Sequence, residues 1–398
     1  MGSLLVGQSG GPTAVINSTA YGVFKEALKH QEIDHLYGSI HGVDGIIKEN
    51  FIEITSEEQL INWNHTPGAI LGSVRFKLKD QETDREIYQK IHQVFKKYDI
   101  KYFFYIGGND SMDTCNKINA YFKSINFDCN VIGLPKTVDN DLVNTDHTPG
   151  YGSAAKIVAT TISEIYHDTS VYQKGRVTIV EIMGRDAGWL TAASHLANYF
   201  NNGPDLIYLP EVAFDMNEFL ESVKTIYEKK KKVLVAISEG IKDAQGEYIL
   251  NYRSSSDGDA FGHIQLGGVA SVLADNVSIK LSLPVRAIEL NLPQRCAAHL
   301  ASKTDVLEAS KCGMFGVRQA LKNKSGYMVS MERSTPYKIK YTLKPLNTVA
   351  NFIKPFPNEW IINNNSISDE YTKYALPLIK GEAYPKFKDG LPIFAKRK

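Results

Sequence analysis

The stretch NVIGLPKTVDNDL, residues 130–142, joins a short apolar run to a dense group of charged and polar side chains. The run at 130–135 is typical of a buried β-strand, and directly behind it come a lysine, a hydroxyl, two acids and an amide. In open α/β sheets, ligands bind where the strands end. The stretch therefore predicts a parallel sheet with a charged ligand site at the end of this strand.

Other parts of the chain repeat the same alternation. Short apolar runs indicate further buried strands at 3–7, 101–108, 176–184, 232–240 and 285–291. Amphipathic spacing indicates helices at 14–29, 111–123, 187–200 and 262–281. Alternating strands and helices are typical of parallel sheets with crossover helices, and 398 residues with 43% apolar content suffice for two domains. We expect an α/β protein with two doubly wound parallel-type sheets and flanking helices.

Composition narrows the partners that the chain could have. The 45 basic and 44 acidic side chains give a net charge of +1, so nothing global indicates nucleic acid or a membrane surface. The start MGSLLVGQSGG has no basic segment before a long apolar one, and no uninterrupted apolar window approaches about eighteen residues. We expect a cytoplasmic protein that binds neither nucleic acid nor membrane.

The cysteines indicate neither a metal site nor a disulfide framework. They are scattered, with no CxxC pair, at Cys115, Cys129, Cys296 and Cys312. We interpret them as inert thiols.

Two strand ends carry glycines that suit a phosphate. Gly10 and Gly11 follow the first run, and glycine lets backbone N–H groups approach an anion at a helix start. A plain tight turn is the alternative. The second end, IGGNDSMDT at 106–114, adds Asn109 and Asp110, which could serve Mg²⁺ held partly by substrate phosphates. A helix-capping turn is the alternative there.

The opening stretch supplies the third candidate site. Asp139 and Asp141 lie two residues apart, so in an extended segment both face one way and Asn140 faces the other. The two acids would repel each other unless a cation or a shared proton lies between them. Lys136 adds a compact charge that suits a phosphate oxygen. The alternative is a polar surface loop without a ligand.

A fourth and a fifth strand end complete the pocket. EIMGRDAGWL, 181–190, places Arg185 after a glycine, where it could bind a second phosphate, and Glu239 in AISEG could accept hydrogen bonds from a sugar. GxxxxGK[ST], HRD and DFG are all missing from the sequence, which excludes P-loop and protein-kinase chemistry. These loops together predict a pocket for two phosphorylated ligands and Mg²⁺.

Six ordered motifs resemble those of the phosphofructokinases, over roughly residues 3–305. They are SGG (9–11), LGSVRF (71–76), GGNDS (107–111), PKTVDND (135–141), EIMGR (181–185) and AISEG (236–240). The resemblance implies a phosphofructokinase-like fold. It also implies Mg²⁺-assisted transfer of a phosphoryl group to the 1-hydroxyl of fructose 6-phosphate, giving fructose 1,6-bisphosphate in a step of glycolysis.

The resemblance also assigns roles to residues. Asp139 is the base that takes the hydroxyl proton, and Thr137 helps to hold the transferring group. The remaining assignments are a metal site at Asp110, Asp141 and Asn109, a donor-phosphate site at Gly11, Arg75, Gly108 and Lys136, and sugar-phosphate binding by Met183, Gly184, Arg185, Glu239, Arg286 and Arg295.

Three positions depart from the family pattern. Asn109 stands where the family usually has a metal-linked acid, and Leu292 where a histidine is expected. GHIQLGG, 262–268, looks like the family's substrate loop but lacks its arginine, and we interpret it as a coincidence at a helix start.

The phosphoryl donor is indicated by two residues. Pyrophosphate-dependent members carry an acid and a lysine where this chain has Asp110 and Lys136. Asp110 would occupy the space of an ATP α-phosphate and repel it, while Lys136 would neutralise the pyrophosphate leaving group. Val43, near the place where ATP users put an aromatic ring, agrees with this prediction. Two alternatives stay open, an ATP-dependent phosphofructokinase and a non-catalytic paralogue that binds sugar phosphates.

The resemblance finally implies an organisation of the chain. We expect a donor-phosphate-binding domain over 1–145, a sugar-phosphate-binding domain over 146–330, and a C-terminal extension over 331–398 that packs on both. In the family, arginines equivalent to Arg176 and Arg286 reach into a neighbouring subunit, so a homodimer or homotetramer with shared sites is expected.

Overall fold

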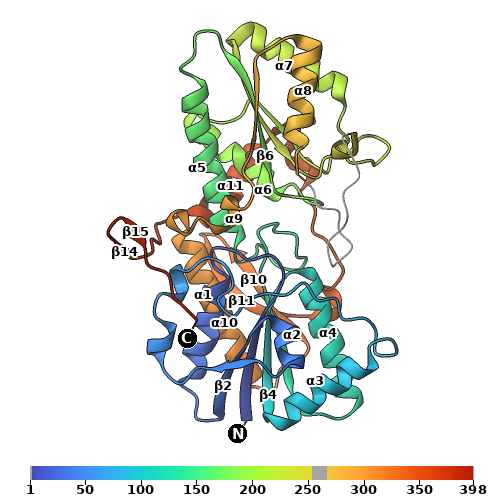
Figure 1. Ribbon diagram of the computed structural model, residues 1–398, viewed down its shortest axis with the longest axis vertical. Coiled ribbons are helices and arrows are strands. Elements are labelled where there is room, and N and C mark those ends of the chain that lie inside the picture. Colours follow the sequence, from blue (N-terminus) through green and yellow to red (C-terminus); the bar gives the residue numbers. More distant parts are fainter. Residues whose placement is uncertain (1, 253–266, 398) are drawn as a thin grey trace.

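A computed structural model describes residues 2–252 and 267–397. It confirms the expected α/β fold, with two mainly parallel sheets, each flanked by helices, arranged along the long axis of the molecule (Figure 1). Among the described residues, no helix is both long enough and apolar enough to cross a lipid bilayer.

The larger sheet has seven strands, in the order β11-β10-β5-β4-β1-β2-β3. Its central strands pair in parallel, and antiparallel β3 and β11 form the two edges. The bounds are β1 (Gly2–Gln8), β2 (Ile33–Ser39), β3 (Phe51–Glu53), β4 (Ile100–Gly107), β5 (Asn130–Pro135), β10 (Tyr327–Ser334) and β11 (Lys338–Pro345). The central strands read as continuous apolar runs because helices cover both of their faces.

Alternate residues of these strands pack against different helices. Leu5 and Phe103 face a core formed with α2 (Gly42–Ile47), α3 (Arg85–Lys97) and α4 (Asn109–Ser124). Leu4 and Phe104 face the opposite core, formed with α1 (Ile16–Ala27) and α10 (Lys303–Ala320). This alternation follows from the two-residue period of a strand, and it makes the sheet doubly wound.

The smaller sheet has four parallel strands, in the order β7-β8-β6-β9. They are β6 (Arg176–Ile182), β7 (Leu206–Tyr208), β8 (Lys232–Ser238) and β9 (Val285–Glu289). Its helices are α5 (Tyr151–Thr169), α6 (Trp189–Ala192), α7 (Met216–Lys230) and α8 (Val269–Leu281). The helix expected at 187–200 is short α6 followed by a 3-10 segment at 193–200, and residues 262–266 of the GHIQLGG match lie outside the described residues.

The sheets divide the chain differently from the expected boundaries at 145 and 330. Helix α10 and strands β10 and β11 belong to the larger sheet, although the smaller sheet precedes them in sequence. A Cβ atom on Gly22 would lie 2.0 Å from the Ser310 carbonyl oxygen, and one on Gly313 would lie 2.2 Å from that of Thr19. These two glycines therefore let the backbones of α1 and α10 touch, which fixes α10 on the larger sheet.

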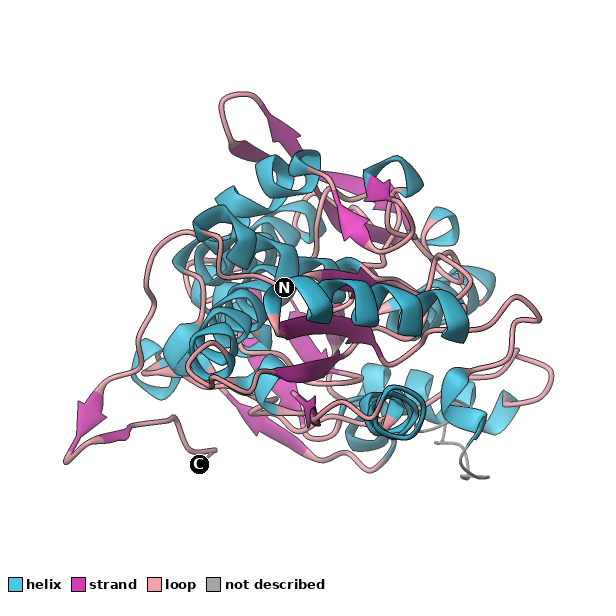
Figure 2. Cartoon of the chain, turned by 90° about the horizontal axis from the view of Figure 1, so that it is seen from above, coloured by secondary structure: helices cyan, strands magenta, loops and turns pink. Residues whose placement is uncertain are grey.

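The residues after β11 pack along the molecule and end in a projecting hairpin. They include α11 (Asp369–Ala375), which packs in the core of the smaller sheet through Tyr371. The hairpin of β14 (Phe387–Lys388) and β15 (Leu391–Pro392) stands away from the body close to the C-terminus (Figure 2).

The close approach of α1 and α10 can be tested by Gly313→Ala. In an ordinary helix this change stabilises by about 1 kcal/mol. Here we expect a loss of about 1–3 kcal/mol, because the added methyl group forces two backbones apart. Gly316→Ala on the same helix is the control, since its Cβ would meet only side-chain carbons at 3.0 Å or more. Denaturant unfolding measures both, and equal stability of the two variants would contradict the packing argument.

Candidate functional site

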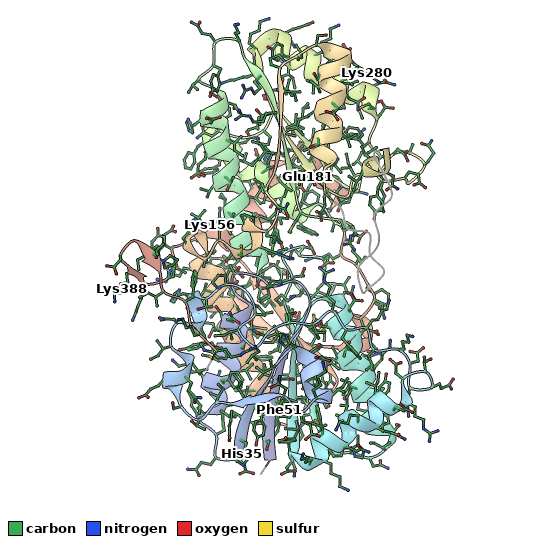
Figure 3. All side chains as sticks on the ribbon, in the orientation of Figure 1. His35, Phe51, Lys156, Glu181, Lys280 and Lys388 are labelled. Carbon is green, nitrogen blue, oxygen red and sulfur yellow. The ribbon has the colours of Figure 1, made fainter. Side chains whose placement is uncertain are left out.

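The carboxyl ends of both sheets face each other, and the candidate site lies between them. Figure 3 shows Glu181, near the end of β6, on the side of the smaller sheet that faces the larger one, while Lys280 lies at the far end. His35, near the start of β2, lies at the opposite extreme of the molecule. The strand ends singled out in the sequence therefore converge, as the rule for open α/β sheets requires.

Lys136 forms the floor of the donor side of the site. Its side chain is buried, and Nζ donates a hydrogen bond to the Gly11 carbonyl oxygen at 2.6 Å. Burial lowers the pKa of Lys136 to about 8, with Arg295 and Arg75 acting in the same direction and Asp139 opposing them. Three basic side chains thus lie close together here, which suits an anion with several charges.

The two glycines above Lys136 leave room for that anion. Gly10 has φ +73°, a conformation that favours glycine, and a Cβ on Gly11 would lie 2.8 Å from Nη1 of Arg295. Ser73 donates from Oγ to the Gly10 carbonyl oxygen at 2.6 Å and fixes the turn. The expected donor residues Gly11, Arg75 and Lys136 therefore lie together. Gly108 joins them, because its Cβ position lies 3.7 Å from the Lys136 carbonyl oxygen.

The acid pair lies directly behind Lys136. Thr137 Oγ1 accepts from the Asp139 N–H at 3.1 Å and donates to Asp139 Oδ2 at 3.3 Å. Burial raises the pKa of Asp139, while Thr137, Lys136 and Arg185 oppose the rise. Burial, and then repulsion from Asp139, raise the pKa of Asp141 to about 7. The pair therefore has the mutual repulsion that the spacing predicts.

Asn140 faces away from the site and anchors the loop. It has φ +54°, accepts from the Thr148 N–H through Oδ1 at 3.1 Å, and donates from Nδ2 to the Tyr374 hydroxyl at 2.9 Å. Thr148 also donates from Oγ1 to the Thr137 carbonyl oxygen at 2.8 Å. The segment is therefore not extended at Asn140, as the spacing argument assumed, but Asp139 and Asp141 are still close enough for the charge of one to raise the pKa of the other.

A buried charge network supports the same loop from behind. His147 lies between Asp146 at 2.7 Å and Glu308 at 2.8 Å. Arg333 donates to Asp146 through two nitrogens, at 3.0 and 2.8 Å, and the Tyr337 hydroxyl donates to Glu308 at 2.8 Å. Burial opposes the charge on His147, but its two acidic partners raise its pKa above the usual value. These charge-assisted hydrogen bonds hold the loop in one position.

The sugar side of the site is built on the ends of β6 and β8. The Gly184 N–H donates to Glu239 Oε1 at 3.3 Å, and Gly184 has φ +142°. Burial is the main cause that raises the pKa of Glu239 to about 7. In the described part of the chain, Nε of Arg185 is buried without a hydrogen-bond partner, next to the charges of Asp139 and Glu239. Such a nitrogen is available to a hydrogen-bond acceptor, which a bound phosphate would supply.

Gln294 completes this side, and it was not predicted. It is buried, accepts from the Met183 N–H through Oε1 at 3.1 Å, and donates to the Asn291 carbonyl oxygen at 2.9 Å. The only signal in the sequence was its place beside Arg295. Arg295 lies on α9 (Pro293–Cys296), which places it in the site. Leu292, which directly precedes α9, is half exposed.

The other two expected arginines do not reach this site within the chain. Arg176 is the first residue of β6, roughly 20 Å of extended strand away from Met183. Arg286 lies opposite Thr178 in the sheet register and is exposed. Both lie at the other end of the smaller sheet from the site.

The expected metal ligands behave unequally. Asn109 begins α4, but its carboxamide is bonded at both ends, accepting from the Asn351 N–H at 2.5 Å and donating to the Phe352 carbonyl oxygen at 2.6 Å. These contacts argue against Asn109 as a metal ligand. Asp110 lies in the first turn of α4, and Asp141 faces Asp139 and Asp186.

The charges nevertheless fit a divalent cation shared with a substrate. No group of three or more His, Cys, Asp or Glu side chains among the described residues is placed to hold a metal by itself. Mg²⁺ is commonly held by one or two carboxylates together with substrate phosphates, and the repelling buried acids would gain from its charge. Cys115, Cys129 and Cys312 are buried, Cys296 is exposed, and all four are free.

The site should reduce the stability of the ligand-free fold above neutral pH. The raised pKa of Glu239, about 7, means that its ionisation opposes folding, and this cost grows as the pH rises from about 4.5 to 7. At pH 8 we expect the free energy of unfolding of Glu239→Gln to exceed that of the unaltered protein by about 1–3 kcal/mol. At pH 4.5 we expect the two proteins to be equally stable, and denaturant unfolding at both pH values measures this. Exposed Glu221→Gln is the control. A constant difference across pH would contradict the assigned burial cost.

Comparisons with known proteins identify relatives of the chain. Residues 3–290 match the family model described as phosphofructokinase. The chain is 41% identical to a pyrophosphate–fructose 6-phosphate 1-phosphotransferase from Xanthomonas campestris pv. campestris (strain B100), covering 100% of this chain and 96% of the relative. A protein of the same name from Halomonas elongata is 38% identical, covering 98% and 94%.

A solved structure shares the whole architecture. The crystal structure of a pyrophosphate-dependent phosphofructokinase from Marinobacter aquaeolei superposes with a TM-score of 0.88 at 35% identity, covering 100% of this chain and 96% of that one. The ordered motifs, the converging strand ends and these matches lead to one conclusion. The chain belongs to the phosphofructokinase family.

Proposed function

We propose that this chain transfers a phosphoryl group, with Mg²⁺, from pyrophosphate to the 1-hydroxyl of fructose 6-phosphate. The products are fructose 1,6-bisphosphate and phosphate. The observation that carries the proposal is the buried Lys136 ammonium beneath Gly11, with Arg75 and Arg295 around it. The names of the relatives from Xanthomonas and Halomonas support it.

The donor side favours a small, highly charged anion. Pyrophosphate would lie over Gly10 and Gly11, with its leaving phosphate neutralised by Lys136. Asp110, in the first turn of α4, would repel a nucleotide α-phosphate by charge and by volume. Val43 is fully buried in the core of the larger sheet, so it offers no platform for an adenine ring.

The acceptor side places a base near the transferring group. Asp139 would take the proton of the sugar hydroxyl, and its raised pKa makes it a stronger base than an exposed aspartate. Thr137 would orient that carboxylate, and Arg185, with the Met183 and Gly184 backbone, would bind the sugar phosphate. Glu239 would accept hydrogen bonds from the sugar. Loose phosphoryl-transfer transition states need this positioning and charge neutralisation more than covalent chemistry.

Magnesium would be held by Asp141 and Asp110 together with phosphate oxygens. When bound, it supplies charge neutralisation at the transferring phosphoryl group. The carboxylate repulsion that raises the pKa of Asp141 is the feature of this chain that supports the assignment.

The assembly that we propose is a homodimer or homotetramer in the cytoplasm. Arg176 and Arg286 would complete the sugar-phosphate site of a neighbouring subunit. Exposed Val171 and Tyr172, the latter with its ring 5.2 Å from the Arg176 guanidinium carbon, give that end of the smaller sheet an apolar surface that could be covered by a neighbour.

The first experiment is a donor comparison. The purified protein is given fructose 6-phosphate and Mg²⁺ with either pyrophosphate or ATP, and fructose 1,6-bisphosphate is measured. We expect product with pyrophosphate only. The double change Asp110→Gly with Lys136→Gly should lower turnover with pyrophosphate by about 100-fold or more, as loss of a preorganised charge does elsewhere.

Other outcomes of this comparison point to the two alternatives. Product with ATP alone, or a double variant that keeps its donor choice, would favour an ATP-dependent kinase. Binding of fructose 6-phosphate without turnover for either donor would favour a non-catalytic paralogue. Lys136→Met, which keeps the buried volume, separates a charge effect from misfolding.

A second experiment tests the base. Asp139→Asn should lower kcat by about 10²–10⁴ while the KM for fructose 6-phosphate changes little, since the amide keeps the shape but cannot accept the proton. Steady-state kinetics measures both constants. Exposed Asp168→Asn on α5 is the control. Unchanged kcat in Asp139→Asn would remove this residue as the base.

A further inference from the structure

Residues 351–356, which we call the C-terminal strap, contact three of the loops that form the site. The strap follows β11 and lies beyond the part of the chain that matches the family model, residues 3–290. Asn351, Phe352 and Ile353 are exposed, so the strap covers these loops from the outside. The loops that it contacts begin α4, carry the acid pair, and lead from Arg185 into α6.

The first contact is with the start of α4. The Asn351 N–H donates to Asn109 Oδ1, and Asn109 Nδ2 donates to the Phe352 carbonyl oxygen at 2.6 Å. Asn351 Nδ2 also donates to Asp113 Oδ1 at 3.1 Å. An amide is needed at 109 to make both backbone bonds, because a carboxylate could accept but not donate. Asp110 is the next residue, so this clamp fixes its position.

The second contact is with the loop of the acid pair. Ile353 and Leu142 form an antiparallel bridge, and the Lys354 N–H donates to the Asp141 carbonyl oxygen at 2.7 Å. Lys354 Nζ reaches the Asp146 carbonyl oxygen at 2.9 Å and that of Thr145 at 3.3 Å. The strap is therefore paired with this loop much as a short strand would be.

The third contact is with the loop between Arg185 and α6. The Trp189 Nε1–H donates to the Lys354 carbonyl oxygen at 3.1 Å, and Lys354 Nζ lies 4.9 Å from the centre of the Trp189 ring. Glu211 Oε1 accepts from the N–H groups of both Phe356 and Gly188, each at 2.8 Å. The sugar side is thus tied to the same six residues as the donor side.

We propose that the strap is a positioning element for phosphoryl transfer, and that Asn109 is its anchor on the donor side. This inference rests on the proposed function. The strap sets the spacing of Asp110, Asp141 and Arg185, which come from three loops on two sheets. Reaction rate depends on such spacing much more steeply than ground-state binding does, and a misplacement of about 1 Å can cost 100-fold.

The test compares two asparagine side chains, each of which donates a hydrogen bond to the segment that follows β11. Asn109→Ala removes the anchor of the strap. Asn144→Gly is the matched control, since Asn144 Nδ2 donates to the Thr348 carbonyl oxygen at 2.9 Å, outside the strap, and glycine tolerates its φ of +61°. We expect Asn109→Ala to lower kcat by about 10–100-fold with the KM for fructose 6-phosphate within about threefold. Asn144→Gly should leave both unchanged.

Asn109→Asp separates positioning from metal binding. It keeps the acceptor for the Asn351 N–H and loses the donor to Phe352, so we expect kcat between those of the unaltered protein and Asn109→Ala. An increase in kcat with a lower Mg²⁺ requirement would instead make 109 a metal position and overturn the proposal.

Hydrogen exchange gives a readout that does not depend on turnover. Asn109→Ala should speed amide exchange at 109–112 and 141–146. Asn144→Gly should leave amide exchange at 109–112 unchanged. If the unaltered protein makes no product from pyrophosphate but this exchange pattern is seen, the proposed function fails, while the strap still holds the loops at 109–112 and 141–146 in place. Unchanged exchange together with unchanged kcat in Asn109→Ala would overturn the strap.

Discussion

The buried ammonium of Lys136 is the interaction on which the site depends. Taking a cation out of water costs several kcal/mol unless protein groups replace its solvation. Here the Gly11 carbonyl oxygen accepts one of its hydrogen bonds and Asp139 offsets its charge, while Arg75 and Arg295 add positive charge nearby. Three basic side chains therefore lie around a glycine turn, an arrangement that suits a bound anion.

The acids of the site are also buried, and their negative charges repel one another. Asp141 and Glu239 have pKa values raised to about 7, so near neutral pH their charged forms reduce the stability of the fold. Natural proteins commonly accept such a cost where function needs it. The network of His147 and Arg333 behind the loop, and the strap in front of it, hold the acids in place against this repulsion.

Strands β1, β4 and β5 of the larger sheet and β6 and β8 of the smaller sheet could be predicted from sequence, because a parallel strand buried on both faces is a continuous apolar run. Strand β5 has the bounds read from the sequence, and the other five predicted strands differ by at most two residues at either end. Strands β10 and β11 were missed for the converse reason. Both carry polar side chains on one face, and β10 pairs with a strand formed far earlier in the chain, so no local pattern reports their place.

The residues of the site also divide into those that a local sequence pattern predicts and those that depend on distant segments. Residues at strand ends were predicted because topology brings such ends together, and Lys136, Asp139, Arg185 and Glu239 all lie there. The partners of Asn109 and the role of Gln294 were not predictable, since each depends on a segment far along the chain. A carboxamide with a backbone partner at both ends looks in sequence like any other polar residue of a capping turn.

The order of strands also constrains how the chain is made. Ile132 pairs with Tyr327, so one edge of β5 stays open until the whole smaller sheet has been synthesised. An open edge of apolar parallel strand is a template for pairing with other chains. During synthesis, the larger sheet therefore passes through a stage in which α10, β10 and β11 are absent and the edge of β5 is open to such pairing. That stage ends when α10 packs against α1, a close contact that Gly22 and Gly313 allow.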